Sequence, residues 1–266
     1  MQKNKFQELI WQKGRELFRP MPWRENTDPY WILVSEMMLQ QTQVDRVIPK
    51  FEAFIQRFPT VMELAKASLS EVLVLWSGLG YNRRAKFLLS AAQMIVEEFG
   101  GEFPSDPIEL KRLPGVGVNT AGAIATYGFN SVAPFIETNV RTVYFRHYFE
   151  DEETITDAEV LEAAINTIDT EHPREWYWAL MDYGSWLKRQ GLGANSRSAH
   201  YTKQAPLKGS VREVRGLLLK LLAQKGTVSY EAAQHELPQD DRFDRALTDL
   251  LHEGLVIHDQ GRLKLP

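Results

Sequence analysis

Two features of the sequence could do chemistry: a turn that contains two glycines, and a glutamate among apolar residues. The turn, PGVG at 114–117, lies between two short predicted helices. Two glycines two residues apart allow positive φ angles and close approach of another backbone, and the following helix presents free amides at its N-terminus. Such a turn can bind an anion, or it can be a tight connection between packed helices. Glu36 lies in the apolar stretch SEMMLQQ; a lone acid there is either exposed or capped, or it is catalytic.

The residues around these two features resemble a known superfamily. Thr120-Ala121 follows the glycine turn as in helix-hairpin-helix motifs, which hold a DNA phosphate through backbone amides. From about Met21 to Gly184 the chain is similar to the helix-hairpin-helix DNA glycosylases, and most similar to their A/G-specific adenine DNA glycosylases. The similarity is carried by PWR at 22–24, SEMMLQQTQV at 35–44, RFPTV at 57–61, LWSGLGYNRRA at 75–85, GGEFP at 100–104, LPGVGVNTAGAI at 113–124 and ALMDYG at 179–184.

The resemblance implies a mechanism with two acids. In these glycosylases the glutamate that matches Glu36 is a general acid, which protonates the purine ring so that the base can leave. A second acid stabilises the positive charge that develops on the sugar. The superfamily uses an aspartate there, and Glu137 takes its position with a side chain one methylene longer. Glu137 could instead only cap the helix that begins near Thr138.

The resemblance also bears on the fate of the DNA strand after base release. Bifunctional members carry a lysine where this chain has Asn119, and that lysine forms a Schiff base with the sugar. An amide cannot form this imine. The resemblance therefore implies a monofunctional hydrolase that uses water and leaves an abasic site, with weak or absent strand cleavage.

Further residues are implied in DNA and base recognition. An enzyme that acts on a stacked base must extrude it. Gln41 matches a residue that enters the duplex beside the opposite base, and Tyr81 matches an aromatic wedge. The implied DNA-binding residues are Gln41, Thr42, Tyr81, Gly115, Gly117 and Thr120. The implied base pocket contains Arg24, Trp178 and Asp182. Trp178 replaces a glutamine of the family, and this replacement changes the polar groups with which the pocket would recognise the base.

The chain contains no cysteine, which bears on the cofactor expected from the resemblance. Most relatives bind a [4Fe–4S] cluster through four cysteines, and none of the residues at the matching positions can supply a thiolate: Lys188, Asn195, Ser198 and Gln204. We therefore expect an enzyme without an iron–sulfur cluster, whose connector is held by packing and hydrogen bonds. Arg197 and His200 are candidates for that work or for phosphate contact. The only metal that the sequence still allows for is a monovalent or divalent ion bound at the hairpin.

The elements that must position these residues are mostly helices. Apolar residues recur at spacings of three and four through most of the first 190 residues. Capping boxes at Ser68–Glu71 and Thr156–Glu159 mark two helix starts. Turn signals at 78–80, 100–107, 114–117 and 134 separate helices of about ten to eighteen residues.

The predicted fold is mostly α, with the two lobes of a helix-hairpin-helix DNA glycosylase and a small C-terminal winged-helix-like domain. The resemblance implies a central helical module with the hairpin at 28–133. The second helical lobe, the counterpart of the iron–sulfur lobe, would combine 1–27 with 134–207. DNA would lie across the cleft between the lobes.

Residues 208–266 show the winged-helix order of three helices and a β-hairpin. The helices are expected at about 210–224, 229–236 and 240–253, and the strands at 255–258 and 262–265. This domain replaces the family's C-terminal domain that recognises 8-oxoguanine. Its 9 basic and 9 acidic residues, with an acid-rich third helix, favour scaffolding or a protein partner over reading of a DNA groove.

Composition narrows the class of protein. The chain has 266 residues, 44% of them hydrophobic, which excludes disorder, and its net charge of −4 gives no global sign of a polyanion partner. No apolar run approaches the roughly 20 residues that cross a bilayer, so we expect no membrane contact. The N-terminal stretch predicts an amphipathic helix rather than a signal peptide, and hence a cytoplasmic protein; its apolar side carries Phe6, Leu9, Ile10 and Leu17.

The leading hypothesis is a base excision repair glycosylase that acts on double-stranded DNA with a mismatch or damaged base, removing adenine opposite guanine or 8-oxoguanine. One alternative is a thymine or uracil mismatch glycosylase on the same scaffold. Another is a catalytically silent protein that binds DNA lesions. A protein partner bound through the C-terminal domain is a separate hypothesis.

Overall fold

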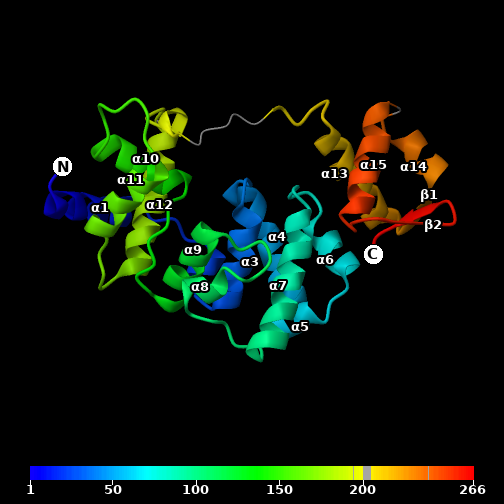
Figure 1. Cartoon of the computed structure of the whole chain (residues 1–266), viewed down its shortest axis with the longest axis horizontal. Coiled ribbons are helices and arrows are strands. Elements are labelled where there is room, and N and C mark those ends of the chain that lie inside the picture. Colours follow the sequence, from blue (N-terminus) through cyan, green and yellow to red (C-terminus); the bar gives the residue numbers. More distant parts are fainter. Residues whose placement is uncertain (194, 200–204, 239) are drawn as a thin grey trace. The chain divides into compact units, whose positions relative to one another are not determined.

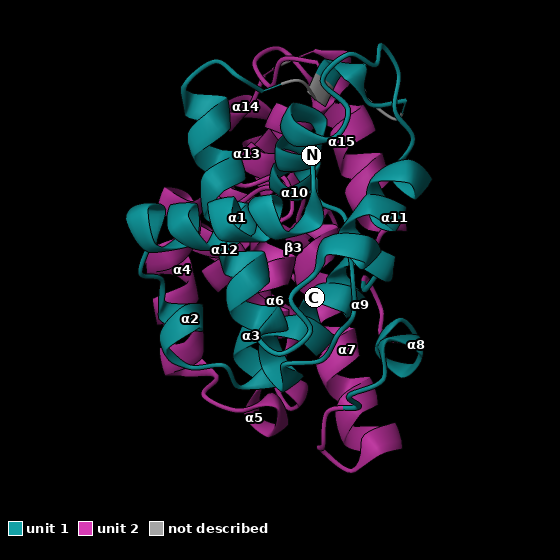
Figure 2. Cartoon of the chain, turned by 90° about the vertical axis from the view of Figure 1, so that its left-hand side faces the viewer, with its two compact units in different colours: residues 1–32, 104–112, 116–203 teal, residues 33–103, 113–115, 204–266 magenta. Residues whose placement is uncertain are grey.

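The computed structural model describes residues 1–193, 195–199, 205–238 and 240–266. The described chain is mostly helical, with short strands near the C-terminus, which confirms the predicted fold class (Figure 1). It forms two compact units, the first made of residues 1–32, 104–112 and 116–203, and the second of residues 33–103, 113–115 and 204–266 (Figure 2). The boundaries at residues 27, 133 and 207 remain predictions. No helix in the described part of the chain has the length and apolar character needed to span a membrane.

The first unit is built around one long aromatic-rich helix, α12. Its elements are α1 (Lys3–Leu17), α2 (Pro22–Glu25), the start of α3 (Pro29–Leu39), α8 (Pro107–Leu110), α9 (Val118–Phe129), α10 (Thr138–His147), α11 (Asp157–Thr167), α12 (Pro173–Arg189) and the 3₁₀ turn η1 (Asn195–Arg197). Phe6 and Ile10 of α1 are fully buried, as the amphipathic pattern predicts, and Phe6 packs its ring against Trp176 of α12. A Cβ at Gly184 of α12 would lie 2.2 Å from the carbonyl oxygen of Asn139. Only glycine therefore lets α12 approach the first turn of α10 so closely.

The second unit begins with the rest of α3 and centres on α7. Its other elements are α4 (Val44–Arg57), α5 (Val61–Ala65), α6 (Leu69–Trp76), α7 (Arg83–Phe99), α13 (Val211–Lys225), β1 (Thr227–Ser229), α14 (Tyr230–Glu236), α15 (Asp241–His252), β2 (Ile257–Asp259) and β3 (Arg262–Lys264). Leu88, Ala92 and Ile95 of α7 recur at spacings of four and three and are fully buried. This pattern produces the apolar stripe that packs against α5 and α6.

Capping boxes fix several helix starts. Ser68 and Glu71 form one at α6, and Thr156 and Glu159 form another at α11, as predicted. A third, which was not predicted, joins Thr60 and Glu63 at α5. In each box the side chains satisfy backbone N–H groups at the helix start, which have no partner within the helix.

The C-terminal region has the predicted order of helices and a β-hairpin, with one additional strand. The sheet order is β1-β3-β2, with antiparallel pairing of Val228 and His258 to Leu263 on either side. Strand β1 was not predicted, because its last residue, Ser229, also caps α14. Strand β2 begins at Ile257, later than predicted, because pairing with β3 begins there; the buried Leu255 and Val256 precede the strand.

Candidate active site

Glu36 occupies the border between the core and the surface of α3. Its neighbours Ser35, Met37 and Met38 are fully buried, whereas Glu36 itself is half-buried. Glu36 therefore lies next to buried residues of its own helix and is itself partly accessible.

A buried arginine that was not predicted from the sequence fixes the end of α3. Arg84 is 6% exposed, and its Nη1 donates to the carbonyl oxygens of Met37, Met38 and Gln40 at 2.8, 2.9 and 2.6 Å. Its Nη2 donates to the carbonyl oxygen of Gly80 at 2.9 Å. Burial lowers the pKa of Arg84 to about 10, which leaves the guanidinium charged at neutral pH. Arg84 thus ties the helix that carries Glu36 to the loop that precedes α7.

The two residues expected to enter the DNA share an unusual backbone conformation. Gln41, just after α3, has φ of 55°, and Tyr81, just before α7, has φ of 47°. Left-handed conformations are uncommon for residues with side chains and occur where the surrounding structure holds them. Thr42, the next predicted DNA-binding residue, instead accepts a hydrogen bond from Arg84 at 3.2 Å. The same arginine network therefore supports both loops.

The two hairpin glycines differ in what requires them. Gly115 has φ of 78°, and a Cβ there would lie 2.7 Å from both Met37 Cε and Phe87 Cβ. Packing within the chain alone therefore requires glycine at this position. A Cβ at Gly117, the N-cap of α9, would meet nothing within 4 Å. Thr120, in the first turn of α9, is half-buried.

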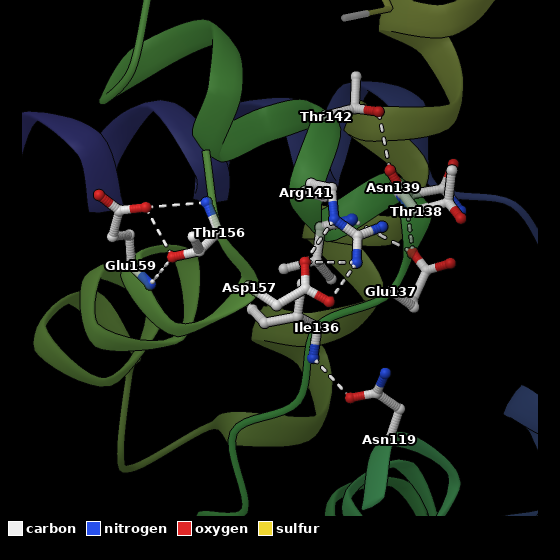
Figure 3. Close-up of polar contacts among 11 residues, drawn as sticks. Asn119, Ile136, Glu137, Thr138, Asn139, Arg141, Thr142, Thr156, Asp157 and Glu159 are labelled. Atoms are coloured by element: carbon white, nitrogen blue, oxygen red, sulfur yellow. Dashed lines mark hydrogen bonds and ion pairs between the residues drawn. The ribbon is translucent and has the colours of Figure 1, made fainter. Parts of the chain in front are cut away.

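Glu137 is the N-cap of α10. Its Oε1 accepts hydrogen bonds from the backbone N–H groups of Asn139 and Val140 at 2.6 and 3.2 Å (Figure 3). The capping role considered from the sequence is therefore present. Both bonds end on one carboxylate oxygen, and Oε2 makes no hydrogen bond or ion pair with the described residues. The cap consequently leaves half of the carboxylate for another partner.

Opposing influences set the pKa of Glu137. Desolvation dominates and raises the pKa above the ordinary value of 4.5. The N–H of Asn139 and the charges of Lys188 and Arg141 oppose that shift. A carboxylate in this position carries a poorly solvated charge, so a cation that develops beside it would stabilise it strongly.

Two asparagines lie near Glu137. Asn119 Oδ1 accepts a hydrogen bond from the N–H of Ile136 at 3.2 Å, which connects α9 to the segment that enters α10 (Figure 3). Asn139 Oδ1 is buried and has no hydrogen-bond partner among the described residues. An unpaired buried acceptor is costly and marks a place where water or a ligand could bind. Asn139 was not predicted, since its only signal in the sequence was its position two residues after the acid.

The three predicted base-pocket residues lie together within the first unit. Arg24 and Asp182 form two hydrogen bonds, at 2.7 and 3.1 Å, and their side chains are 5% and 1% exposed. Arg19 Nε binds the same carboxylate at 2.6 Å. The carbon of the Arg24 guanidinium is 5.4 and 5.5 Å from the ring centroids of Phe18 and Trp178, and these two rings contact each other edge to face. Asp182 is thus paired with two arginines, and both Phe18 and the half-buried Trp178 present accessible aromatic surface.

The segment at the expected cluster positions is fastened by backbone bonds and an arginine. Ile155 and Ser198 form a parallel bridge, and the N–H of Ile155 donates to the carbonyl oxygen of Arg197 at 3.1 Å. Arg197 Nε donates to the carbonyl oxygen of Glu152 at 2.7 Å. Arg197 therefore does the fastening work for which it was a candidate. His200 and Gln204 lie outside the described residues.

The described residues contain no group of three or more His, Asp and Glu side chains arranged to hold a metal ion. The ion considered for the hairpin remains a prediction.

Comparison with known proteins places these features in a family. Residues 34–167 match the model of the HhH-GPD superfamily of base excision DNA repair proteins. The chain belongs to this superfamily. It is 38% identical over 262 residues to the adenine DNA glycosylase of Mycolicibacterium smegmatis, a match that covers 90% of this chain and 88% of that protein. It is 42% identical over 130 residues to the adenine DNA glycosylase of Buchnera aphidicola subsp. Baizongia pistaciae, where the match covers 49% of this chain and 37% of that protein.

Solved structures agree with the HhH-GPD assignment. A thermostable thymine-DNA glycosylase superposes with a TM-score of 0.61 at 25% identity, over 68% of this chain and 87% of that one. Endonuclease III, in a covalent DNA complex, superposes with a TM-score of 0.56 at 20% identity, over 77% and 91% of the two chains. The second likeness is one of fold.

Proposed function

We propose that this HhH-GPD protein is a monofunctional DNA glycosylase that removes adenine mispaired with guanine or 8-oxoguanine. The observation that carries the proposal is the match to the Mycolicibacterium adenine DNA glycosylase along almost the whole of both chains. The catalytic pair would be Glu36 and Glu137, which stand at the positions of the family's two acids.

Glu36 would act as the general acid. It stands half-buried on α3, beside the buried Met37 and Met38, at the position of the family's proton donor. Transfer of that proton to a ring nitrogen of adenine would let the base leave with the electron pair of the glycosidic bond. The sugar would be left with the positive charge of an oxocarbenium ion.

Glu137 would stabilise that positive charge. Its carboxylate is desolvated, and one of its oxygens is not engaged by the cap. An anion of this kind interacts more favourably with the cationic transition state than with the neutral substrate. This preferential stabilisation of the transition state accelerates the reaction. A water molecule would then add to the sugar carbon, and the unpaired Asn139 Oδ1 is an acceptor that could orient it.

The end product would be an abasic site in an intact strand. Asn119, which stands where bifunctional relatives carry lysine, has no nucleophilic amine, and its oxygen is bonded to the N–H of Ile136. The fastening of the segment around Arg197 supports a fold that works without an iron–sulfur cluster.

Double-stranded DNA with a mismatch would be bound through backbone amides and inserted side chains. The open space at Gly117 suits the close approach of a phosphate to the uncapped N-terminus of α9. Gln41 and Tyr81, held in left-handed conformations, would contact the opposite base.

A second candidate is excision of thymine or uracil from mismatches. The structural likeness to a thymine-DNA glycosylase favours it, as does Trp178 at a pocket position where the family has glutamine. In this case the same two acids would act on a pyrimidine.

A substrate panel tests both candidates. Duplexes with adenine, thymine, uracil or hypoxanthine opposite each normal base and 8-oxoguanine are incubated with excess protein, and abasic sites are cleaved with alkali. We expect fastest release of adenine opposite guanine or 8-oxoguanine. Preferential release of thymine or uracil would establish the second candidate, and no release from any duplex would refute glycosylase activity.

A further inference from the structure

A side chain of the C-terminal region contacts the residue expected to wedge into DNA. Arg212, in the first turn of α13, donates from Nη1 to the hydroxyl group of Tyr81 at 3.0 Å. Its Nη2 donates to the carbonyl oxygen of Ala205 at 2.6 Å. All three residues belong to the second compact unit. Arg212 therefore joins the wedge loop, the end of the connector and α13.

Other contacts hold the C-terminal region in place beside α6 and α7. Lys86 Nζ donates to the carbonyl oxygen of Glu253 at 2.6 Å, and the N–H of Ser70 donates to the carbonyl oxygen of Pro266 at 3.1 Å. The side chain of Ser210 caps α13 by accepting from the N–H of Glu213 at 3.3 Å. The C-terminal region is thus docked through contacts that do not involve Arg212, and the helix that carries Arg212 has a capped start of its own.

Tyr81 is held from two sides. Its ring lies over the buried guanidinium of Arg84, whose carbon is 5.6 Å from the ring centroid, and its hydroxyl group meets Arg212. The side chain is nevertheless 38% exposed, and its backbone is left-handed. An exposed tyrosine normally samples several rotamers, and fixing it beforehand removes that entropic cost from binding.

We propose that Arg212 is a positioning residue for Tyr81, and that the winged-helix-like region thereby takes part in discriminating the base opposite the excised one. The proposal rests on the proposed function, in which Tyr81 contacts the opposite base. It gives this region a role in DNA recognition that requires neither a basic recognition helix nor a protein partner.

A double-mutant cycle on the full-length chain tests the coupling. Single-turnover excision of adenine opposite 8-oxoguanine and opposite cytosine is measured for wild type, Arg212→Met, Tyr81→Phe and the double variant. Each single change should lower the ratio of the two rates about fivefold, and the double variant should fall no further, because either change removes the same hydrogen bond. Arg212→Lys, which keeps a donor, should recover part of the ratio.

Two control variants separate this effect from a general loss of stability in the C-terminal region. Lys220→Met removes an exposed positive charge from the same helix, and Lys86→Met removes a docking contact that does not involve Tyr81. Both should leave the ratio within about twofold of wild type, with thermal unfolding recorded for every variant. Multiplicative effects in the double variant, or an equal loss in Lys86→Met, would overturn the proposal while wild-type excision still stood. Absence of excision by wild type would refute the proposed function itself.

Discussion

The two candidate carboxylates occupy contrasting regions of the molecule. Glu36 lies inside helix α3, where backbone N–H groups are used within the helix and the neighbouring side chains are buried. Glu137 stands at the N-terminus of α10, where two unpaired N–H groups donate to it. A helix N-terminus offers a carboxylate hydrogen bonds from unpaired N–H groups and a favourable dipole, which the backbone of a helix interior does not.

This contrast teaches that position within a helix can give chemically identical side chains different backbone surroundings. Under the proposed function Glu36 is the proton donor, and Glu137, at the N-terminus of α10, is the anion. Desolvation complicates the second assignment, because it raises the pKa of Glu137 and so makes its charge harder to keep. The charge is then stabilised most when a cation forms beside it.

The largest expected effect comes from removing the acid of the helix interior. Glu36→Gln keeps the size and hydrogen-bonding capacity of the side chain but has no proton to give. Base release should fall about 10²- to 10⁴-fold, while affinity for the mismatched duplex stays within a few-fold of wild type. Single-turnover rates and fluorescence anisotropy measure the two quantities. An active Glu36→Gln protein would remove the acid role.

The capping acid should matter somewhat less. Glu137→Gln retains an oxygen to accept from the N–H groups of Asn139 and Val140 but loses the charge, and excision should fall about 10²- to 10³-fold. Glu137→Asp is the matched control, because it keeps both the charge and a good N-cap. We expect the aspartate variant to be faster than the glutamine variant. Equal rates would mean that Glu137 acts only through its cap.

The pH dependence of the free energy of unfolding tests the surroundings of Glu137 separately from catalysis. Because the pKa of Glu137 is raised in the folded protein, the folded state binds this proton more tightly than the unfolded chain does. The contribution of Glu137 to stability is therefore fully present below pH 4.5 and is lost as the pH rises through the raised pKa. Denaturant unfolding should show wild type losing stability relative to Glu137→Gln across that range. A constant difference between the two proteins would contradict the raised pKa.

The smallest expected effect is a gained activity. A lysine at position 119 would add a nucleophile to the region of Glu137, at the cost of the hydrogen bond from the N–H of Ile136. Asn119→Lys should yield a minor fraction of DNA trapped covalently by borohydride, with wild type yielding only background. Trapping of wild type at the same level would show that another amine of the protein forms the Schiff base with the sugar, and that the protein is bifunctional.

Much of the fold could be predicted because it depends on local patterns. The spacing of Phe6 and Ile10 indicates an amphipathic helix, and the boxes at Ser68 and Thr156 mark helix starts, since these signals act within a few residues of the chain. The winged-helix order followed from the same local rules. They failed at β1, where a residue that caps a helix also ends a strand.

The site was less predictable because its polar contacts join distant residues. Arg24 and Asp182 are 158 residues apart, and Tyr81 and Arg212 are 131 apart, so no spacing rule connects them. Arg84 looks like a surface residue in the sequence, yet it is buried because backbone carbonyl oxygens, which have no sequence signature, satisfy it. Family motifs pointed to Glu36 and Glu137, but the cap at Glu137 and the unpaired oxygen of Asn139 required the structure.

The division of labour between the two carboxylates can be measured directly with a substrate mimic. Two duplexes are compared, one with a neutral abasic sugar analogue at the target position and one with a cationic pyrrolidine there. Wild type and Glu36→Gln should bind the cationic duplex at least about tenfold more tightly than the neutral one, and Glu137→Gln should lose that preference. An unchanged preference in Glu137→Gln would contradict the account, because the anion that meets the sugar cation would then lie elsewhere.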